Sequence, residues 1–438
     1  MSMRESITPE MLAEYTARVK ELEVPRKKSG RGMLVFLLIC AMFGGVLGFL
    51  GVYVLEEGLV GVEVVPPFPL KKSLEFVYLI LVIIGFYVMM LIHVIAHEAG
   101  HLVFGLLTGY EFLSFRVGSF TIVKKDGKLI RKKIKTPGLA GQCLMSPPEW
   151  KDNEKFPYIL YNLGGGFMNL FLCLLAVPLF FIHVPFLAWA GGFSIFVGVI
   201  FAITNVVPMT VGVPNDGKNC LLCSKSRENQ RAIYLQLKMN AMLSDGAEVT
   251  ELTEDLFVIG PKEELNPLTF FVRLLEYYKY VELGEDEKAE VLLATLEQNG
   301  QKLPVAFINT LDLERLYRML LAKSPLVELA VYSKMMQPVF LKVKDISILR
   351  VKYAYLALLS DEEREIIDWL MYSKKGKLPT KLPKRKPETA EQVFEAMVNA
   401  YDKHPVIGEA VFHLNQAKKC MGYAEKIETE EVTDVSEE

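Results

Sequence analysis

Four apolar stretches, each about as long as a membrane-spanning helix, constrain the fold of this chain more than any other feature. A bilayer core about 30 Å thick requires about 20 helical residues. The stretches cover residues 33–55, 74–107, 156–182 and 186–207. A short segment separates the last two, which predicts a tight helical hairpin. The sequence therefore predicts a polytopic α-helical membrane protein with about four transmembrane helices.

The composition agrees with a membrane protein that also has a soluble part. Of the 438 residues, 51% are hydrophobic and 23% are charged, and the apolar residues are concentrated before residue 210. The formal net charge of -3 gives no indication of nucleic-acid binding. Six scattered cysteines do not suggest a disulfide framework, and the single Cys220-x-x-Cys223 pair cannot complete a tetrahedral zinc site. Residues 1–32 are polar, so we expect an N-terminal segment followed by a membrane anchor at 33–55, with no secretory signal peptide.

Basic residues in the loops predict the orientation. Arginines and lysines at 26–31 precede the first span, and a second basic cluster at 124–135 follows the second span. Basic loops lie on the cytoplasmic side, so both chain ends are expected in the cytoplasm of a multi-pass protein of the cell membrane. Lys71 and Lys72, in the opposite loop, are the contrary signal.

Three segments outside the spans have recognisable patterns. Residues 112–135 predict a small membrane-edge β-hairpin, because β-branched and aromatic residues flank the turn signal Asp126-Gly127. This hairpin either packs incidentally or offers an open strand edge to an extended peptide. Residues 218–424 predict an all-α soluble cytoplasmic domain that resembles tetratricopeptide-like helical hairpins. Residues 425–438 are acidic and lack aromatic residues, which predicts a disordered tail.

The segment HVIAHEAGH, His93 to His101, contains a metal-hydrolase pattern at the end of the second apolar stretch. His97 and His101 lie at i and i+4 on one helical face and can bind one metal ion, and Glu98 can reach a water beside it. Zinc lowers the pKa of such a water, and a carboxylate can accept its proton. The alternative is a set of interfacial histidines facing headgroups, with Glu98 paired to a lysine. Ionisable side chains at membrane depth are costly, which favours the metal site.

A tetrahedral catalytic zinc site needs a third protein ligand from the same depth. Asp216 follows the fourth apolar stretch on the same predicted side as His101, and is either this ligand or a turn residue before Gly217. His93 lies one further turn from His97, about 6 Å along the helix axis, too far for three histidines to share one ion. His93 is therefore outside the ligand set: it supports a ligand, lines a substrate channel or bonds to a neighbouring helix.

Together these elements resemble the site-2 protease family of intramembrane zinc metalloproteases. The resemblance covers residues 74–217. It rests on three motifs: His97-Glu-Ala-Gly-His101, Asn205-x-x-Pro208 followed by Asp216-Gly217, and Gly164-Gly-Gly-Phe-Met-Asn169. It implies that His97, His101 and Asp216 bind Zn²⁺, that Glu98 is the general base, and that Asn205, with Asn169, positions the substrate or steadies the oxyanion. The additional residues MTVGV make the interval before Asp216 longer than the family pattern.

We therefore expect a zinc metalloendopeptidase that cleaves a peptide bond in or near the transmembrane segment of a membrane-protein or peptide substrate. Signalling cleavage and peptide maturation are both compatible with the sequence. The helical domain is expected to bind a substrate or a protein regulator. The alternative from another class is a catalytically silent membrane scaffold or receptor of the same fold that recruits partners through this domain. An intact Glu98 argues against the alternative.

Overall fold

The computed structural model describes residues 3–23, 34, 37–38, 41, 45, 75–125, 127–134, 140–182, 184–262, 264–340, 344–383 and 388–434. The predicted first span at 33–55 therefore lies almost entirely outside the described residues. The chain divides into two compact units. The first consists of Ser29–Lys133 and Leu139–Ala241, and the second of Met1–Lys28, Ile134–Gly138 and Met242–Glu438.

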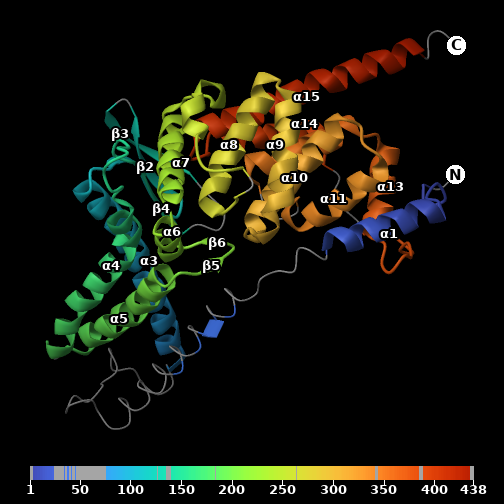
Figure 1. Ribbon diagram of the computed structural model, residues 1–438. Coiled ribbons are helices and arrows are strands. Elements are labelled where there is room, and N and C mark those ends of the chain that lie inside the picture. The colour runs from blue at the N-terminus through green and yellow to red at the C-terminus, as the bar shows by residue number, and fades with distance from the viewer. Residues whose placement is uncertain are drawn as a thin grey trace. The chain divides into compact units, whose positions relative to one another are not determined.

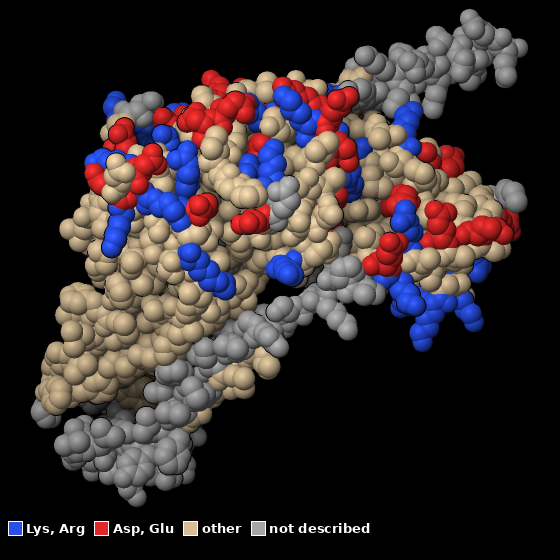
Figure 2. Space-filling model, viewed as in Figure 1, with Lys and Arg blue, Asp and Glu red and all other residues tan. Residues whose placement is uncertain are grey.

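Among the described residues, three helices of the first unit are long and apolar enough to cross a membrane (Figure 1). They are α3 (Glu75–Leu107), α4 (Tyr158–Ala176) with its 3-10 extension η2 (Val177–Phe181), and α5 (Pro185–Val206). Prolines in η2 and at the first turn of α5 mark the change of direction, in agreement with the predicted helical hairpin. The face of α4 and α5 visible in Figure 2 carries no charged side chain, as lipid contact requires.

Helices α3 and α4 approach each other closely where both carry glycine. A Cβ on Gly100 would lie 2.2 Å from the carbonyl oxygen of Gly164, and a Cβ on Gly164 would lie 2.7 Å from that of Gly100. A side chain at either position would force the helices apart. Small residues at such interfaces allow membrane helices to pack through their backbones. This contact holds α4 against the part of α3 that carries the histidines.

A four-stranded antiparallel sheet follows α3, with strand order β3-β2-β1-β4. The strands are β1 (Glu111–Val117), β2 (Phe120–Lys125), β3 (Lys128–Lys133) and β4 (Gly141–Ser146). Lys125 pairs with Lys128, as the predicted two-residue turn requires, and Gly127 has a φ of +74°, whereas Asp126 lies outside the described residues. The structure differs from a simple hairpin, since residues 112–135 contain β1 as well as β2 and β3.

Strand β4 was not predicted from the sequence. Its residues GQCLMS show no clear alternation of apolar and polar side chains, although Cys143 and Met145 are buried. Among the described strands only β1 pairs with β4, so β4 is an edge strand of the sheet. It also contacts α3, the helix that carries the histidines.

The second unit is built of helices, and residues near the N-terminus together with residues between Leu313 and Cys420 form one apolar core in it. Its helices are α1 (Pro9–Glu23), α8 (Pro267–Leu283), α9 (Asp286–Asn299), α10 (Val305–Leu321), α11 (Leu326–Phe340), α12 (Ile346–Leu358), α13 (Asp361–Met371), α14 (Ala390–Tyr401) and α15 (Ile407–Asp434), with the 3-10 helices η3 (Val249–Glu251), η4 (Glu254–Phe257) and η5 (Gly300–Lys302). A likeness to tetratricopeptide repeats stays a prediction.

Two boundaries differ from those expected. Helix α15 continues to Asp434, so most of the acidic segment predicted to be disordered from residue 425 is helical. Glutamate, which is frequent in this segment, is a good helix former, and a helix already begun can extend through such residues. The unit that contains α3 to α5 extends to Ala241, later than the predicted boundary at 217/218.

Candidate metal centre

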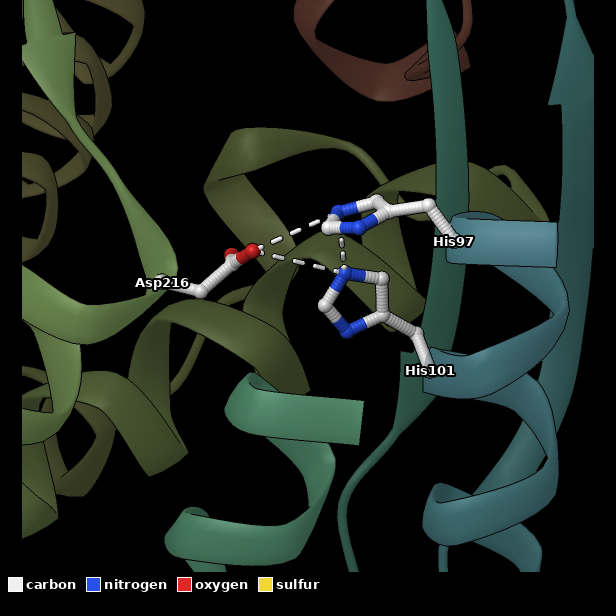
Figure 3. A group of neighbouring side chains, drawn as sticks. All are labelled: His97, His101 and Asp216. Carbon is white, nitrogen blue, oxygen red and sulfur yellow. Dashed lines mark hydrogen bonds and ion pairs between the residues drawn. The ribbon is translucent and has the colours of Figure 1, made fainter. Parts of the chain in front are cut away.

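Helix α3 places His97 and His101 one turn apart, with their rings nearly perpendicular and 4.7 Å apart between centroids (Figure 3). Their Nε2 atoms are 3.1 Å apart. Both side chains are buried, with 9% of each residue exposed. The i, i+4 spacing predicted this pair directly.

Asp216 reaches the two histidines from the first residue of helix α6 (Asp216–Cys223). Its Oδ2 lies 3.4 Å from Nε2 of His97 and 3.6 Å from Nε2 of His101 (Figure 3). Among the described residues, these three form a group of potential ligand atoms that all lie within 4.8 Å of one another. The structure thus brings together the three residues predicted to bind the metal.

Asn215 holds this end of α6 in place. Its side-chain amide donates to the carbonyl oxygens of Thr204 and Val207, at 2.7 Å each, and its Oδ1 accepts from the backbone N–H of Lys218 at 2.9 Å. The same side chain therefore caps α6 and ties it to the end of α5. Asp216 follows directly and is positioned by this double attachment.

The additional residues before Asp216 do not move it away from the histidines. They form a small hairpin of β5 (Thr210–Val211) and β6 (Val213–Pro214). Gly212 is at its tip with a φ of +79°, a left-handed conformation that favours glycine. Because the extra length folds back on itself, Asp216 remains within ligand distance of the histidines.

The three ligand atoms fit a zinc ion. Zinc binds histidine nitrogen and carboxylate oxygen at about 2.0–2.2 Å in a tetrahedron, whose edges are then about 3.4 Å long. The three observed separations of 3.1, 3.4 and 3.6 Å are close to such edges. Two imidazoles and one carboxylate also form a ligand set that catalytic zinc uses, with a fourth position for water.

The outer nitrogens of both histidines have partners. Nδ1 of His101 donates to the carbonyl oxygen of Tyr161 at 2.8 Å, which leaves its Nε2 lone pair for a metal. Nδ1 of His97 lies 3.3 Å from Nδ2 of Asn169. Gly165 is packed against the His97 ring, where a Cβ would lie 2.4 Å from Cε1. Helix α4 thus supports both rings.

Glu98 lies beside the histidines, 8% exposed, against strand β4. A Cβ on Gly141 would lie 2.5 Å from its Oε1, so only glycine leaves room for the carboxyl there. Arg116 of β1 interacts electrostatically with Glu98 and contacts Gln142 of β4 at 3.4 Å. Burial lowers the pKa of Arg116, and the charge of Glu98 opposes this effect.

A pocket of about 470 Å³ opens onto these side chains. It is lined by His97, Glu98, His101, Gly141, Gln142, Cys143, Tyr161, Asn162, Thr204, Asn205, Met209, Val211, Val213, Pro214, Asn215, Asp216, Asn219, Ile233, Gln236 and Leu237. The last three belong to α7 (Arg227–Asp245), which sequence patterns had assigned to the helical domain. Asn205 lines the pocket. Asn169 is fully buried and absent from this lining.

Two cysteines near the site have raised pKa values. Burial and the charge of Glu98 raise the pKa of Cys143 to about 12, and burial and the charge of Asp216 raise the pKa of Cys220 to about 12. Their thiols therefore stay protonated near neutral pH.

Several contributors to the site have no motif in the sequence. The carbonyl oxygen of Tyr161 is a backbone group, and any residue could supply it. Gly141 and Gly165 matter because they lack side chains, a property visible only beside Glu98 and His97. Asn215 has a local signal, since Asn followed by a short helix is a typical N-cap.

In comparison with known proteins, the family model described as Peptidase family M50 matches residues 85–418, more than half of the chain. No curated protein and no solved structure matches the chain.

Proposed function

Because the chain belongs to Peptidase family M50, the site-2 protease family, we propose that it is an intramembrane zinc metalloprotease that cleaves a peptide bond in or near a transmembrane segment of its substrate. Family membership implies an intramembrane metalloprotease. The observation that carries the finer proposal is the grouping of His97, His101 and Asp216, with Glu98 in the same pocket, on helices apolar enough to span a membrane.

In this proposal each protein group has one task. His97, His101 and Asp216 would hold a zinc ion, which polarises the scissile carbonyl and lowers the pKa of water. Glu98 accepts a proton from the attacking water and later delivers it to the leaving amine. Gly141 keeps space for the Glu98 carboxyl. Arg116 places positive charge near this carboxyl.

The edge of β4 is the proposed binding place for the substrate backbone. A helical peptide bond is shielded by its own hydrogen bonds, so the substrate must locally unwind before cleavage. Gly141, Gln142 and Cys143 of this edge strand line the pocket, and an extended segment can add to it as a further strand. The sequence had suggested the hairpin at 112–135 for this task, and β4 extends the same sheet up to Glu98.

Asn205 and the β5–β6 hairpin complete the proposed substrate contacts. Asn205 donates one amide hydrogen to the carbonyl oxygen of Phe201 at 2.8 Å, and the other can donate to a substrate carbonyl. Met209, Val211 and Val213 present apolar surface to the pocket, and Val213 is 47% exposed. This wall favours apolar substrate side chains, as found in transmembrane segments.

The packing of α1 supports the predicted topology. Ile7 and Tyr15 are buried in the core of the second unit, and Arg18 pairs with Glu328 of α11 at 2.8 Å. This packing supports the proposal that the N-terminal helix and the C-terminal helices lie on one side of a membrane, which requires an even number of crossings between them. Three are described, and the expected span at 33–55 would be the fourth. The basic loops favour the cytoplasm as that side.

The helical domain is proposed to bind a substrate or a protein regulator. Because α7 lines the pocket, a truncation that tests this must keep α7 and remove residues 246–438. We expect this truncation to change substrate choice while zinc content is retained. If the truncated protein prefers several substrates in the same order as the wild type, the helical domain does not have the proposed role in substrate choice.

The decisive test compares zinc content and cleavage of a transmembrane substrate by the wild type and by Glu98→Gln. We expect both proteins to bind about one zinc and only the wild type to cleave. Zinc binding without cleavage by either would favour the scaffold alternative. Asp216→Asn is expected to lose zinc, whereas Asp152→Asn, on a loop outside the pocket, should retain it.

A further inference from the structure

His93 stands at the far end of a buried chain of polar side chains that begins at His97. Nδ2 of Asn169 lies 3.3 Å from Nδ1 of His97, and Oδ1 of Asn169 lies 3.0 Å from Nδ1 of His93. Nε2 of His93 lies 3.1 Å from Oγ of Ser194. His93 and Asn169 are fully buried and Ser194 is 6% exposed. The chain therefore crosses from α3 to α4, back to α3, and on to α5.

The surrounding helices make room for this arrangement. A Cβ on Gly198 of α5 would lie 2.4 Å from Cε1 of His93, so glycine is needed for the ring to fit. Polar groups inside a membrane protein are costly unless they are hydrogen-bonded, and His93 has a partner at each ring nitrogen. An apolar residue at position 93 would avoid this requirement, so packing alone does not account for a histidine there.

Metal binding places a condition on Asn169. A neutral imidazole that offers its Nε2 lone pair to a metal carries its proton on Nδ1. For His97 this proton needs an acceptor, and the adjacent side-chain group that can accept it is the amide oxygen of Asn169. The amide nitrogen faces His97 in the structure, so zinc binding requires the amide to turn by about 180°.

Turning the amide changes what His93 must do. The amide nitrogen of Asn169 then donates to Nδ1 of His93, so the proton of His93 moves to Nε2. There the hydroxyl of Ser194 can accept it, because a hydroxyl both donates and accepts. His93 and Ser194 can therefore satisfy Asn169 in either orientation.

We propose that His93, backed by Ser194, is a positioning residue that lets Asn169 present its oxygen to Nδ1 of His97 and so sets the metal-binding tautomer of His97. The proposal rests on the zinc site of the proposed function. It gives Asn169 a role behind the ligand, in place of the contact with substrate that the sequence suggested, and it assigns His93 a function.

The test measures the affinity of the purified full-length protein for Zn²⁺ by competition with a chromogenic chelator. Removal of the group that hydrogen-bonds to the second ring nitrogen of a metal-bound histidine lowers the metal affinity by about 10–100-fold. We expect losses in this range for His93→Leu and Asn169→Leu. His93→Asn, whose amide oxygen can accept at the position of Nδ1, should stay within about threefold of the wild type. Cys173→Ala is the matched control, because Cys173 is buried beside His93 without bonding to it.

A second measurement follows the tautomer directly in the wild-type protein. Zinc is added to protein with ¹⁵N-labelled histidine, and the His93 signals are assigned by their loss in His93→Asn. In the zinc-bound protein we expect the proton of His93 on Nε2. Wild-type affinity in His93→Leu, or a His93 proton on Nδ1 in the zinc-bound wild type, would overturn the proposal. Failure of the wild type to bind zinc would instead overturn the proposed function.

Discussion

Gly165 lies against the ring of His97, and we predict that Gly165→Ala weakens zinc binding by at least about 100-fold. A Cβ at this position would lie 2.4 Å from Cε1, 2.5 Å from Nδ1 and 2.7 Å from Nε2 of His97. Ordinary carbon contacts are about 3.5–4.0 Å, so the ring must move by about 1 Å. A zinc ligand tolerates only about 0.2 Å. The loss of zinc affinity should therefore be at least about 100-fold, which is the upper end of the loss seen when a hydrogen-bond partner of a metal-bound histidine is removed.

The assay for Gly165→Ala is the zinc affinity of the purified protein, measured together with its thermal unfolding midpoint. Gly192→Ala is the control, because its Cβ would meet the nearest atom, of Phe180, at an ordinary 3.9 Å. Both substitutions gain about 1 kcal/mol of helix propensity, so propensity cannot explain a difference between them. Wild-type zinc affinity in Gly165→Ala would refute the steric reasoning.

Three further predictions address the base, the pocket wall and the thiols. Gly141→Ala should displace the carboxyl of Glu98 and lower the turnover number by about 10²–10⁴-fold, while the protein keeps its zinc. Loss of zinc together with turnover would contradict this prediction. Val213→Asp should raise KM for an apolar substrate at unchanged zinc affinity, and an unchanged KM would exclude this wall from binding. Burial raises the pKa of both Cys143 and Cys420 to about 12. Unfolded thiols ionise near pH 8.5, so above that pH the folded state retains more protons and stability falls. The thermal unfolding midpoint should fall between about pH 8.5 and 10.5, and it should fall less steeply in the variant with both Cys143→Ala and Cys420→Ala. Equal slopes of midpoint against pH in the two proteins would refute this assignment to the two thiols.

The elements predicted best from the sequence are those with a local physical cause. The described spans follow from the length of their apolar runs, and His97 and His101 share a face because a helix repeats every 3.6 residues. The left-handed conformation of Gly127 agrees with the Asp-Gly turn signal, because glycine accepts a positive φ. The resemblance to the site-2 protease family is confirmed by the family match.

The contacts that could not be predicted join parts of the chain far apart in sequence. Strand β4 lacks an alternating pattern, and its place beside Glu98 depends on pairing with β1. The pocket wall formed by α7 has no local signal, because an amphipathic helix shows that it packs but not against what. His93 looked like a third histidine in one motif, and its partners Asn169 and Ser194 lie on two other helices.

The sequence by itself determined the candidate residues: the helical histidine pair, Glu98 between them, and an aspartate that follows an apolar stretch. Only the tertiary structure decided that Asp216 reaches His97 and His101, at 3.4 and 3.6 Å, despite the added residues. The physical reason is that spacing along a helix is local geometry. The position of Asp216 instead depends on a hairpin that folds back and on the attachment of Asn215 to the end of α5.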